Sequence, residues 1–283
     1  MHSPISRRSA LVSTAGLASA AFLTSATQGS ARGAAPTARP VDLFLNLGQS
    51  NAGGDNAAKL TAAYKQFLTP LPQVRFVSAN SAALTWSTLK PTKIGFGEAA
   101  VHHLYTTRPA YSSGARTIAL FKYSVGSTST AQWKSTHMKA AVKHLNAAIA
   151  KLLADPTVSS VRVLDMVWIQ GEQDVIDGDA YRYGSRFRGL HNMVRAGVPE
   201  AKKMHATVVH LNPTWSRYTS SPERKRETAL FNKEVTTLGK GSIINDLWSP
   251  NPAHRGDGTH YSADSFARGG VALAKIWAKQ HAL

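Results

Sequence analysis

Short apolar runs alternate with longer amphipathic stretches along most of the chain. The apolar runs are rich in Val, Ile, Leu and Phe, which is typical of strands buried on both faces of a sheet. They predict strands at Asp42–Leu47, Thr117–Tyr123, Val161–Ile169, His205–Leu211 and Ser242–Asp246.

The stretches between these runs place apolar residues at helical spacing. Lys139–Ala154 shows the pattern clearly, and Asp155-Pro156 ends it because a proline disfavours helical backbone at the residue before it. The alternation of strands and helices predicts an α/β fold, a three-layer α/β/α sandwich whose central parallel sheet has five strands. The segment Asn51–Lys93, rich in Ser, Thr and Pro, is predicted to be an irregular excursion. Further helices are predicted at Tyr181–Ala196, Glu223–Leu238 and Ala263–Lys279, the last of them capped by Ser262.

The N-terminal segment, residues 1–31, has the pattern of an export signal. Arg7-Arg8 precede an Ala-rich apolar stretch that ends in small residues, as in twin-arginine signals. That stretch is too short and too rich in Ala, Ser and Thr to span a bilayer, and a disordered Ala-rich tail is the alternative interpretation. We therefore predict a secreted or periplasmic protein without a membrane anchor, with a linker over residues 32–40 and one domain over residues 41–283.

The charge balance is strongly basic, with 33 Lys and Arg against 16 Asp and Glu and a formal net charge of +17. The basic residues are scattered and are not interleaved with stacking aromatics, so we expect no nucleic-acid partner. The charge is interpreted as a feature for solubility and substrate steering. The chain has no Cys, which excludes disulfides, thiolate catalysis and Cys-based zinc sites.

Polar, Gly-containing segments follow the predicted strands. Parallel strands bring their carboxyl ends to one edge of a sheet, where ligands bind in open α/β folds. We therefore expect these segments and the loop before the last helix to converge. They read Gly48-Gln49-Ser50-Asn51, Ser124-Val125-Gly126-Ser127-Thr128, Gln170-Gly171-Glu172-Gln173-Asp174 and Gly256-Asp257-Gly258-Thr259-His260-Tyr261.

A serine hydroxyl becomes a nucleophile when a base takes its proton and a third group orients that base. Asp257 and His260 are three residues apart with Gly258 between them, so the carboxylate can fold back onto one imidazole nitrogen. The other nitrogen is then available to Ser50. Taken alone, Asp257 would be an ordinary Asp-Gly turn and His260 an ordinary surface histidine. Together with Ser50 they predict a hydrolytic triad.

The four motifs, in this order, resemble the SGNH/GDSL hydrolase superfamily, and most of all its sialate O-acetylesterase branch, which includes acetyl xylan esterases of carbohydrate esterase family 6. The resemblance spans Gly48 to His260, and it implies a flavodoxin-like fold and an esterase that needs no cofactor. The α/β-hydrolase elbow G-x-S-x-G is absent, because Ala52 stands where its second glycine would be.

Carried over by position, the resemblance implies Ser50 as the nucleophile, His260 as the general base and Asp257 as the residue that orients it. The oxyanion hole would comprise the backbone N–H of Ser50, the N–H of Gly126 and the side-chain amide of Gln170. Gln170 stands where the wider superfamily has Asn. The remaining site residues are predicted as supports or pocket walls: Gln49, Asn51, Glu172, for which a structural carboxylate bonding backbone N–H groups of neighbouring loops is favoured, and Trp133.

The function predicted is therefore an exported serine esterase that removes O-acetyl groups from carbohydrate of the sialate or acetylxylan type. The basic charge favours an anionic glycan. Three alternatives stay open. They are a carbohydrate-binding or cell-envelope protein without turnover on the same scaffold, a general lipase or arylesterase, and a basic nucleic-acid or anionic-polymer binder, which rests only on the charge. The histidines form no ligand set such as H-E-x-x-H, so no metal is predicted.

Overall fold

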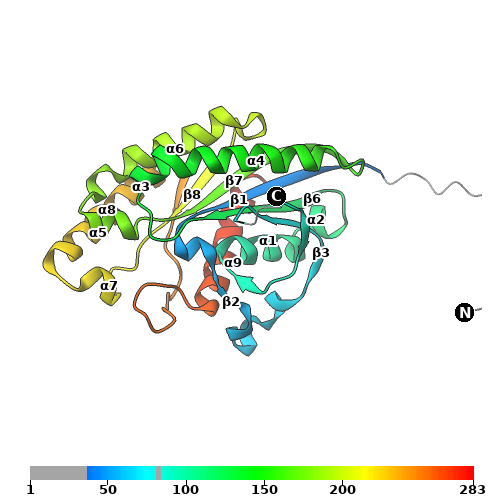
Figure 1. Ribbon diagram of the computed structural model, residues 1–283. Helices are drawn as coiled ribbons and strands as arrows, with labels where there is room; N and C mark the ends of the chain where they lie inside the picture. Colours follow the sequence, from blue (N-terminus) through cyan, green and yellow to red (C-terminus); the bar gives the residue numbers. More distant parts are fainter. Residues whose placement is uncertain (1–36, 81–83, 242) are drawn as a thin grey trace, which may run out of the picture. The chain divides into compact units, whose positions relative to one another are not determined.

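A seven-stranded sheet lies at the centre of the computed structural model, which describes residues 37–80, 84–241 and 243–283 (Figure 1). Its strand order is β4-β3-β6-β1-β7-β8-β9, and every neighbouring pair is parallel except β3 and β4. The strands are β1 (Arg39–Gly48), β3 (Leu71–Ser78), β4 (Ser87–Leu89), β6 (Thr117–Ser124), β7 (Val158–Ile169), β8 (His205–Val209) and β9 (Ile244–Leu247).

The five predicted strands are confirmed as β1, β6, β7, β8 and β9. The prediction of an irregular excursion over Asn51–Lys93 is wrong, because β3 and β4 lie within it and extend the sheet beyond five strands. The buried residues of β3 are spaced three apart, at Leu71, Val74 and Val77, so the segment lacks the alternation that marks a strand. The same segment holds β2 (Asp55–Asn56), which pairs with β5 (Lys93–Ile94) in a second, small sheet.

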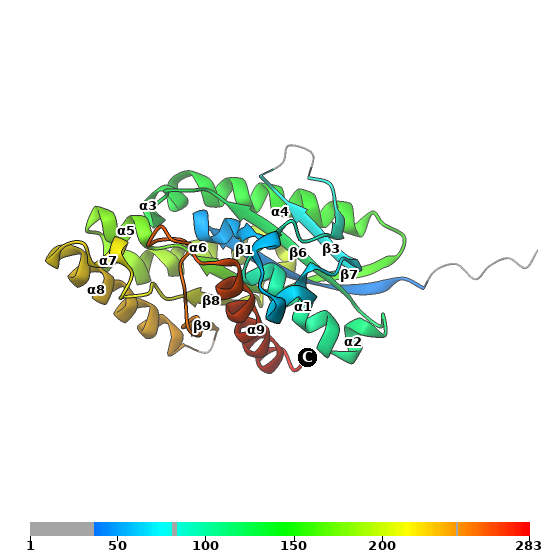
Figure 2. The same cartoon turned by 90° about the horizontal axis from the view of Figure 1, so that it is seen from below.

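Helices cover both faces of the large sheet, which confirms the three-layer sandwich. On one face lie α4 (Met138–Leu153), α6 (Tyr183–Gly197) and α8 (Pro222–Gly239), and on the other lie α1 (Phe96–Thr107) and α9 (Ala263–Gln280), as Figures 1 and 2 show. Ser262 caps α9 as predicted, since its hydroxyl accepts from the N–H of Ser265. The shorter helices are α2 (Pro109–Ser112), α3 (Thr130–Gln132), α5 (Glu172–Asp177) and α7 (Ser216–Thr219).

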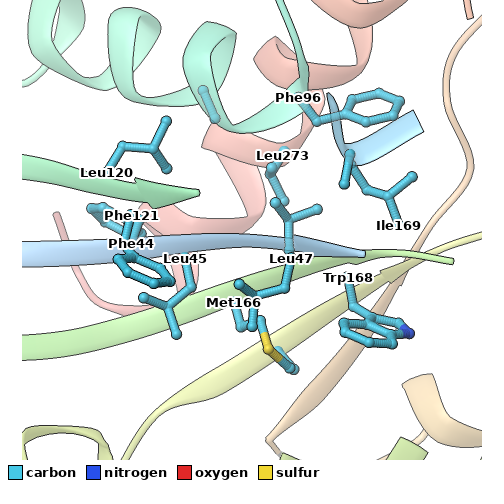
Figure 3. Close-up of a cluster of buried hydrophobic side chains, with 14 of the residues drawn as sticks. Phe44, Leu45, Leu47, Phe96, Leu120, Phe121, Met166, Trp168, Ile169 and Leu273 are labelled. Carbon is cyan, nitrogen blue, oxygen red and sulfur yellow. The ribbon is translucent and has the colours of Figure 1, made fainter. Parts of the chain in front are cut away.

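The core is built on β1, whose side chains from Val41 to Leu47 are almost fully buried. Phe44 stacks on Trp277 of α9, with ring centroids 4.3 Å apart, and Leu45 and Leu47 lie in the cluster shown in Figure 3. Burying one such side chain contributes about 1.5–3 kcal/mol to the free energy of unfolding. This packing fixes the position at which β1 ends.

The register of the central strands decides what lies at the carboxyl edge of the sheet. Gly48, the last residue of β1, pairs with Ser124 of β6 on one side and with Ile169 of β7 on the other. The segments that follow these three residues therefore begin at the same level of the sheet. Within the described residues, no helix is long and apolar enough to cross a membrane. The predicted export signal and residues 32–36 of the predicted linker lie outside the described residues.

Candidate active site

The turn after β1 depends on a glycine. Gly48 has a φ of +143°, and a Cβ added there would lie 2.0 Å from the carbonyl oxygen of Ile169. Only a residue without a side chain fits this backbone. The chain then enters a 3₁₀ turn, Ser50–Gly53, so Ser50 opens this turn two residues past the end of β1.

Ser50 lies beside the loop that precedes α9, although the two are 210 residues apart. Its hydroxyl is 2.9 Å from Nε2 of His260, and Nδ1 of His260 is 2.8 Å from Oδ2 of Asp257. In Figures 1 and 2 the segment after β1 and the loop before α9 lie side by side. A neutral imidazole that donates from Nδ1–H to the carboxylate accepts from the serine at Nε2, which is the arrangement of a hydrolytic triad.

The backbone of the Asp257 turn holds its carboxylate in place. Oδ1 accepts from the N–H groups of Thr259 and His260, at 3.0 and 2.8 Å. Burial alone would raise the pKa of Asp257, but the hydrogen bonds donated by the N–H of His260 and the guanidinium of Arg255 hold it well below its ordinary value. The carboxylate is therefore ionised at neutral pH and can stabilise a protonated imidazole.

Asn51 joins the turn after β1 to the loop that holds the histidine. Its side-chain amide donates to the carbonyl of Thr259 at 3.1 Å, and its Oδ1 accepts from the N–H of Tyr261 at 3.1 Å. These two bonds flank His260 on both sides. The same amide donates to Oε1 of Glu172 at 2.7 Å. Asn51 is thus bonded to the base-bearing loop rather than only to its own turn.

Glu172 lies behind Asn51 and is only 3% exposed. Burial raises the pKa of Glu172, and the hydrogen bond from Asn51 opposes that rise. The expected partners were backbone N–H groups of neighbouring loops. Among the described residues, its bonded partner from another loop is instead the Asn51 side chain, and its Oε2 has no partner.

Two backbone N–H groups at this edge of the sheet, those of Ser50 and Gly126, are the candidate oxyanion donors. The N–H of Val125 donates to the carbonyl of Gly48 at 3.0 Å, which brings the loop after β6 against the turn after β1. Among the described residues, no acceptor is bonded to the N–H of Ser50 or of Gly126. A Cβ added at Gly126 would meet no atom within 4 Å, so packing does not require this glycine. Its bare backbone leaves the space next to the serine open to a ligand.

Gln170 does not offer the amide donor that its position predicted. Its Nε2 donates to the carbonyl of Thr128 at 2.9 Å and to Oδ2 of Asp174 at 2.5 Å, which occupies both of its N–H bonds. The same carboxylate accepts from the N–H of Thr130. Gln170 therefore ties the loop after β7 to the start of α3, and the expectation of a side-chain oxyanion donor is corrected.

Trp133 is not a wall of the pocket, contrary to prediction. It is fully buried, donates from Nε1 to Oγ1 of Thr128 at 2.9 Å, and packs edge-on against Trp168 with ring centroids 4.8 Å apart. Gln49 is also buried, with its carbonyl accepting from the N–H of Ala52 within the turn. Trp133 therefore stabilises the loop after β6, and Gln49 stabilises the turn after β1.

Arg255 and His254 belong to the site but did not stand out in the sequence. The N–H of Arg255 donates to the carbonyl of His260 at 2.9 Å, and its Nε donates to Oδ2 of Asp257 at 2.8 Å. Nδ1 of His254 accepts from the N–H groups of Gly256 and Gly258. These bonds close the loop into a tight hairpin. The two residues stand directly before the recognised motif, but only the folded hairpin gives them contacts.

A cavity of about 440 Å³ opens beside the 3₁₀ turn that carries Ser50. Gly53, the last residue of that turn, lines the cavity together with Ser124, Lys90 and Lys93. Lys122, also in the lining, donates to the carbonyl of Gly53 and to Oε1 of Glu98. In the part of the chain that the structure describes, no three His, Asp or Glu side chains gather as a metal site would require. The lining carries three lysines, Lys90, Lys93 and Lys122, against one acid, Glu98, so the cavity is basic and suits an anionic ligand.

Comparisons with known proteins agree with this geometry. A model of a carbohydrate esterase family, the sialic acid-specific acetylesterases, matches residues 40–279. None of the curated proteins matches the chain. Among solved structures, a protein of Arabidopsis thaliana is 16% identical with a TM-score of 0.65, over 84% of this chain and 98% of its own. NanS is 11% identical with a TM-score of 0.61, over 87% of this chain and 98% of its own.

A carbohydrate acetylesterase from Xanthomonas citri is 17% identical with a TM-score of 0.57, over 84% of this chain. The match covers 56% of the Xanthomonas citri protein, so the chain spans little more than half its length. At these identities the solved structures show a shared fold, while the family model covers nearly the whole described chain and confirms the resemblance read from the four motifs. The chain belongs to the carbohydrate esterase family of sialic acid-specific acetylesterases, and it is a hydrolase of carboxylic esters.

Proposed function

We propose that the protein removes O-acetyl groups from carbohydrate through an acetyl-enzyme formed on Ser50. The observation that carries this proposal is the unbroken chain of contacts from Ser50 through His260 to Asp257, at 2.9 and 2.8 Å. Each neighbouring pair is within hydrogen-bond reach, which is the geometric requirement for activating a serine.

In the first half of the reaction, Nε2 of His260 takes the proton of Ser50 as its Oγ bonds to the acetyl carbon. The carbonyl oxygen becomes an oxyanion, and the N–H groups of Ser50 and Gly126 are the donors that can receive it. His260 then gives the proton to the sugar oxygen as the ester bond breaks. The deacetylated sugar leaves, and the acetyl group stays on Ser50.

In the second half, a water molecule attacks the acetyl-enzyme while His260 takes one of its protons. The oxyanion forms again in the same place. The bond between the acetyl carbon and Oγ breaks, His260 returns the proton to Ser50, and acetic acid leaves and ionises to acetate in water. Asp257 stays ionised throughout and stabilises the imidazolium, as its lowered pKa allows.

An acetylated sugar of anionic type is the substrate class that we favour. Lys90 and Lys93 line the cavity beside the serine turn, and the whole chain carries a net charge of +17. The family is described by its action on sialic acid, which bears a carboxylate. Acetylated xylan is the neutral competitor, and both belong in the test.

The test compares the wild type with Ser50→Ala on p-nitrophenyl acetate, p-nitrophenyl butyrate, O-acetylated sialic acid and acetylated xylan. We expect Ser50→Ala to lose at least roughly 10³-fold in kcat. Ser185→Ala, an exposed serine on α6, is the matched control and should keep wild-type rates. Acetate release by Ser50→Ala at the wild-type rate would refute the mechanism. Binding of glycans without release by the wild type would support a non-catalytic binding protein instead.

We also propose that the protein is exported through the twin-arginine signal predicted over residues 1–31. Arg7 and Arg8 carry this proposal. Changing both to Lys should leave the protein in the cytoplasm of a bacterial host, with its N-terminal segment retained in the mass spectrum. Equal export of the Lys variant and the wild type would contradict it.

A further inference from the structure

An exposed tryptophan stands at the same edge of the sheet as the triad. Trp248 follows β9 and is 50% exposed. Its ring stacks on the imidazole of His210, which follows β8, with centroids 3.8 Å apart and planes within 8° of parallel. An exposed indole that is stacked in one orientation offers a flat apolar face to a ligand.

The histidine beneath the tryptophan is held rigidly. His210 is 1% exposed, with Nε2 at 2.9 Å from Oδ2 of Asp246 and Nδ1 at 3.2 Å from Oδ1 of Asn232. Asn232 is itself fixed, since its amide accepts from the N–H of Leu211 and donates to its carbonyl. The indole of Trp248 therefore packs on an imidazole that is already fixed before any ligand binds, which lowers the entropic cost of binding.

A cavity of about 360 Å³ opens beside this stacked pair. Ser249 lines it, and its hydroxyl is buried and without a partner among the described residues. The lining contains no Lys, Arg, Asp or Glu. An aromatic face, an unpaired hydroxyl and an uncharged wall together suit a ring that has C–H faces and hydroxyl groups. The other residues that line it are Asn212, Pro213, Thr214, Pro252 and Tyr261.

Tyr261 connects this cavity to the triad. It follows His260 directly, its N–H donates to Oδ1 of Asn51, and its hydroxyl donates to the carbonyl of His210. In the strand order, β1 and β9 are separated by β7 and β8. Three spacings of about 4.8 Å place the two strands roughly 14 Å apart, which is more than one sugar ring spans.

We propose that Trp248 and this cavity form a subsite for a second sugar ring of the acetylated glycan, so that the enzyme acts on oligosaccharides or polysaccharides. The inference rests on the proposed deacetylation at Ser50. The ring that bears the acetyl group lies at the serine, and a neighbouring ring stacks on the exposed indole. The subsite itself recognises an uncharged ring, whereas an anionic group on the acetylated ring is recognised by Lys90 and Lys93.

The first test uses the ratio of kcat/KM on an oligosaccharide to kcat/KM on p-nitrophenyl acetate, which cannot reach the subsite. The oligosaccharides are acetylated xylohexaose and O-acetylated sialyllactose, in both of which the ring next to the acetylated one is uncharged. We expect Trp248→Ala to lower this ratio about tenfold, mainly through KM, as the loss of one aromatic contact predicts. Trp248→Phe keeps an aromatic face and should restore most of it. Tyr181→Ala removes another exposed aromatic, which is 56% exposed, and should leave the ratio at the wild-type value.

A second test does not depend on turnover. Binding of the same oligosaccharides is measured by calorimetry on Ser50→Ala and on Ser50→Ala combined with Trp248→Ala. A dissociation constant about tenfold weaker in the double variant supports the subsite. Equal affinities, or an unchanged kinetic ratio in Trp248→Ala, overturn it. Acetate release by Ser50→Ala would instead refute the proposed function, and the two failures are therefore distinguishable.

Discussion

Replacement of Asn51 by Ala tests how the turn after β1 positions the base. Asn51 is 1% exposed and makes hydrogen bonds with Glu172, Thr259 and Tyr261. Two neutral bonds contribute about 1 kcal/mol each, and the bond to a buried carboxyl contributes about 1–3 kcal/mol. The free energy of unfolding should therefore fall by about 3–5 kcal/mol, and the Tm by on the order of 10 °C for a domain of this size.

The effect on catalysis should be separable from the effect on stability. The lost bonds flank His260, and a displacement of about 1 Å in a catalytic group costs roughly 10²-fold in rate. Stopped-flow or steady-state hydrolysis of p-nitrophenyl acetate at 20 °C, with folding checked by circular dichroism, measures this loss. Asn56→Ala is the control, because exposed Asn56 accepts only one local bond, from the N–H of Ala58. A folded Asn51→Ala protein with kcat within twofold of wild type would refute the idea that these bonds place the base.

Three further predictions concern other residues of the site. Gly48→Ala must move the turn away from the carbonyl of Ile169 and should lower the free energy of unfolding in urea by at least roughly 3 kcal/mol. Gly53→Ala, whose Cβ would meet nothing closer than 3.7 Å, should lower it little. Equal losses of unfolding free energy in the two variants would contradict this. Burial raises the pKa of Glu172 above its ordinary value of 4.5, so the folded protein keeps a proton that the unfolded chain releases. The free energy of unfolding therefore falls as the pH rises from 4.5 through the pKa of the folded state. Glu172→Gln should therefore raise the urea midpoint at about pH 7.5 more than at about pH 4.5, and a pH-independent change would count against a buried ionisable carboxyl. Gly126→Pro removes the backbone N–H and should lose roughly 10²–10³-fold in kcat, the order expected for one oxyanion donor, whereas Gly126→Ala, which keeps the N–H and whose Cβ would meet no atom within 4 Å, should unfold at the wild-type urea concentration and stay active; a folded Gly126→Pro protein with full activity would exclude Gly126 from the oxyanion hole.

Several expectations failed for reasons that the sequence could not reveal. The strand β3 carries its buried residues three apart, and its pairing with β4 is irregular between Leu71 and Arg75, so it lacks the alternation of a regular strand. Trp133 was expected in the pocket because it follows the Gly126 loop closely. The π-helical turn Trp133–His137 instead directs its ring into the core against Trp168.

For Gln170, the sequence predicted the position of the residue but not the hydrogen-bond partners of its side-chain amide. Its position at the end of β7 was predictable, but the direction of its amide depends on Asp174 and Thr128, which lie on two different segments. A buried amide donates to whichever acceptors surround it, because an unpaired donor in the interior is costly. The sequence alone does not predict which acceptors those are.

The sequence alone determined the layered α/β architecture, the order of the loops at the edge of the sheet and the residue types that they present. It could do so because burial repeats with the period of a strand or a helix, and because catalytic groups must be of particular chemical kinds. Only the tertiary structure decided which atoms meet. Ser50 and His260 are 210 residues apart, and their 2.9 Å contact exists because strand register, the Gly48 turn and Asn51 bring two distant loops together. Such contacts depend on the packing of the whole core, which no local pattern encodes.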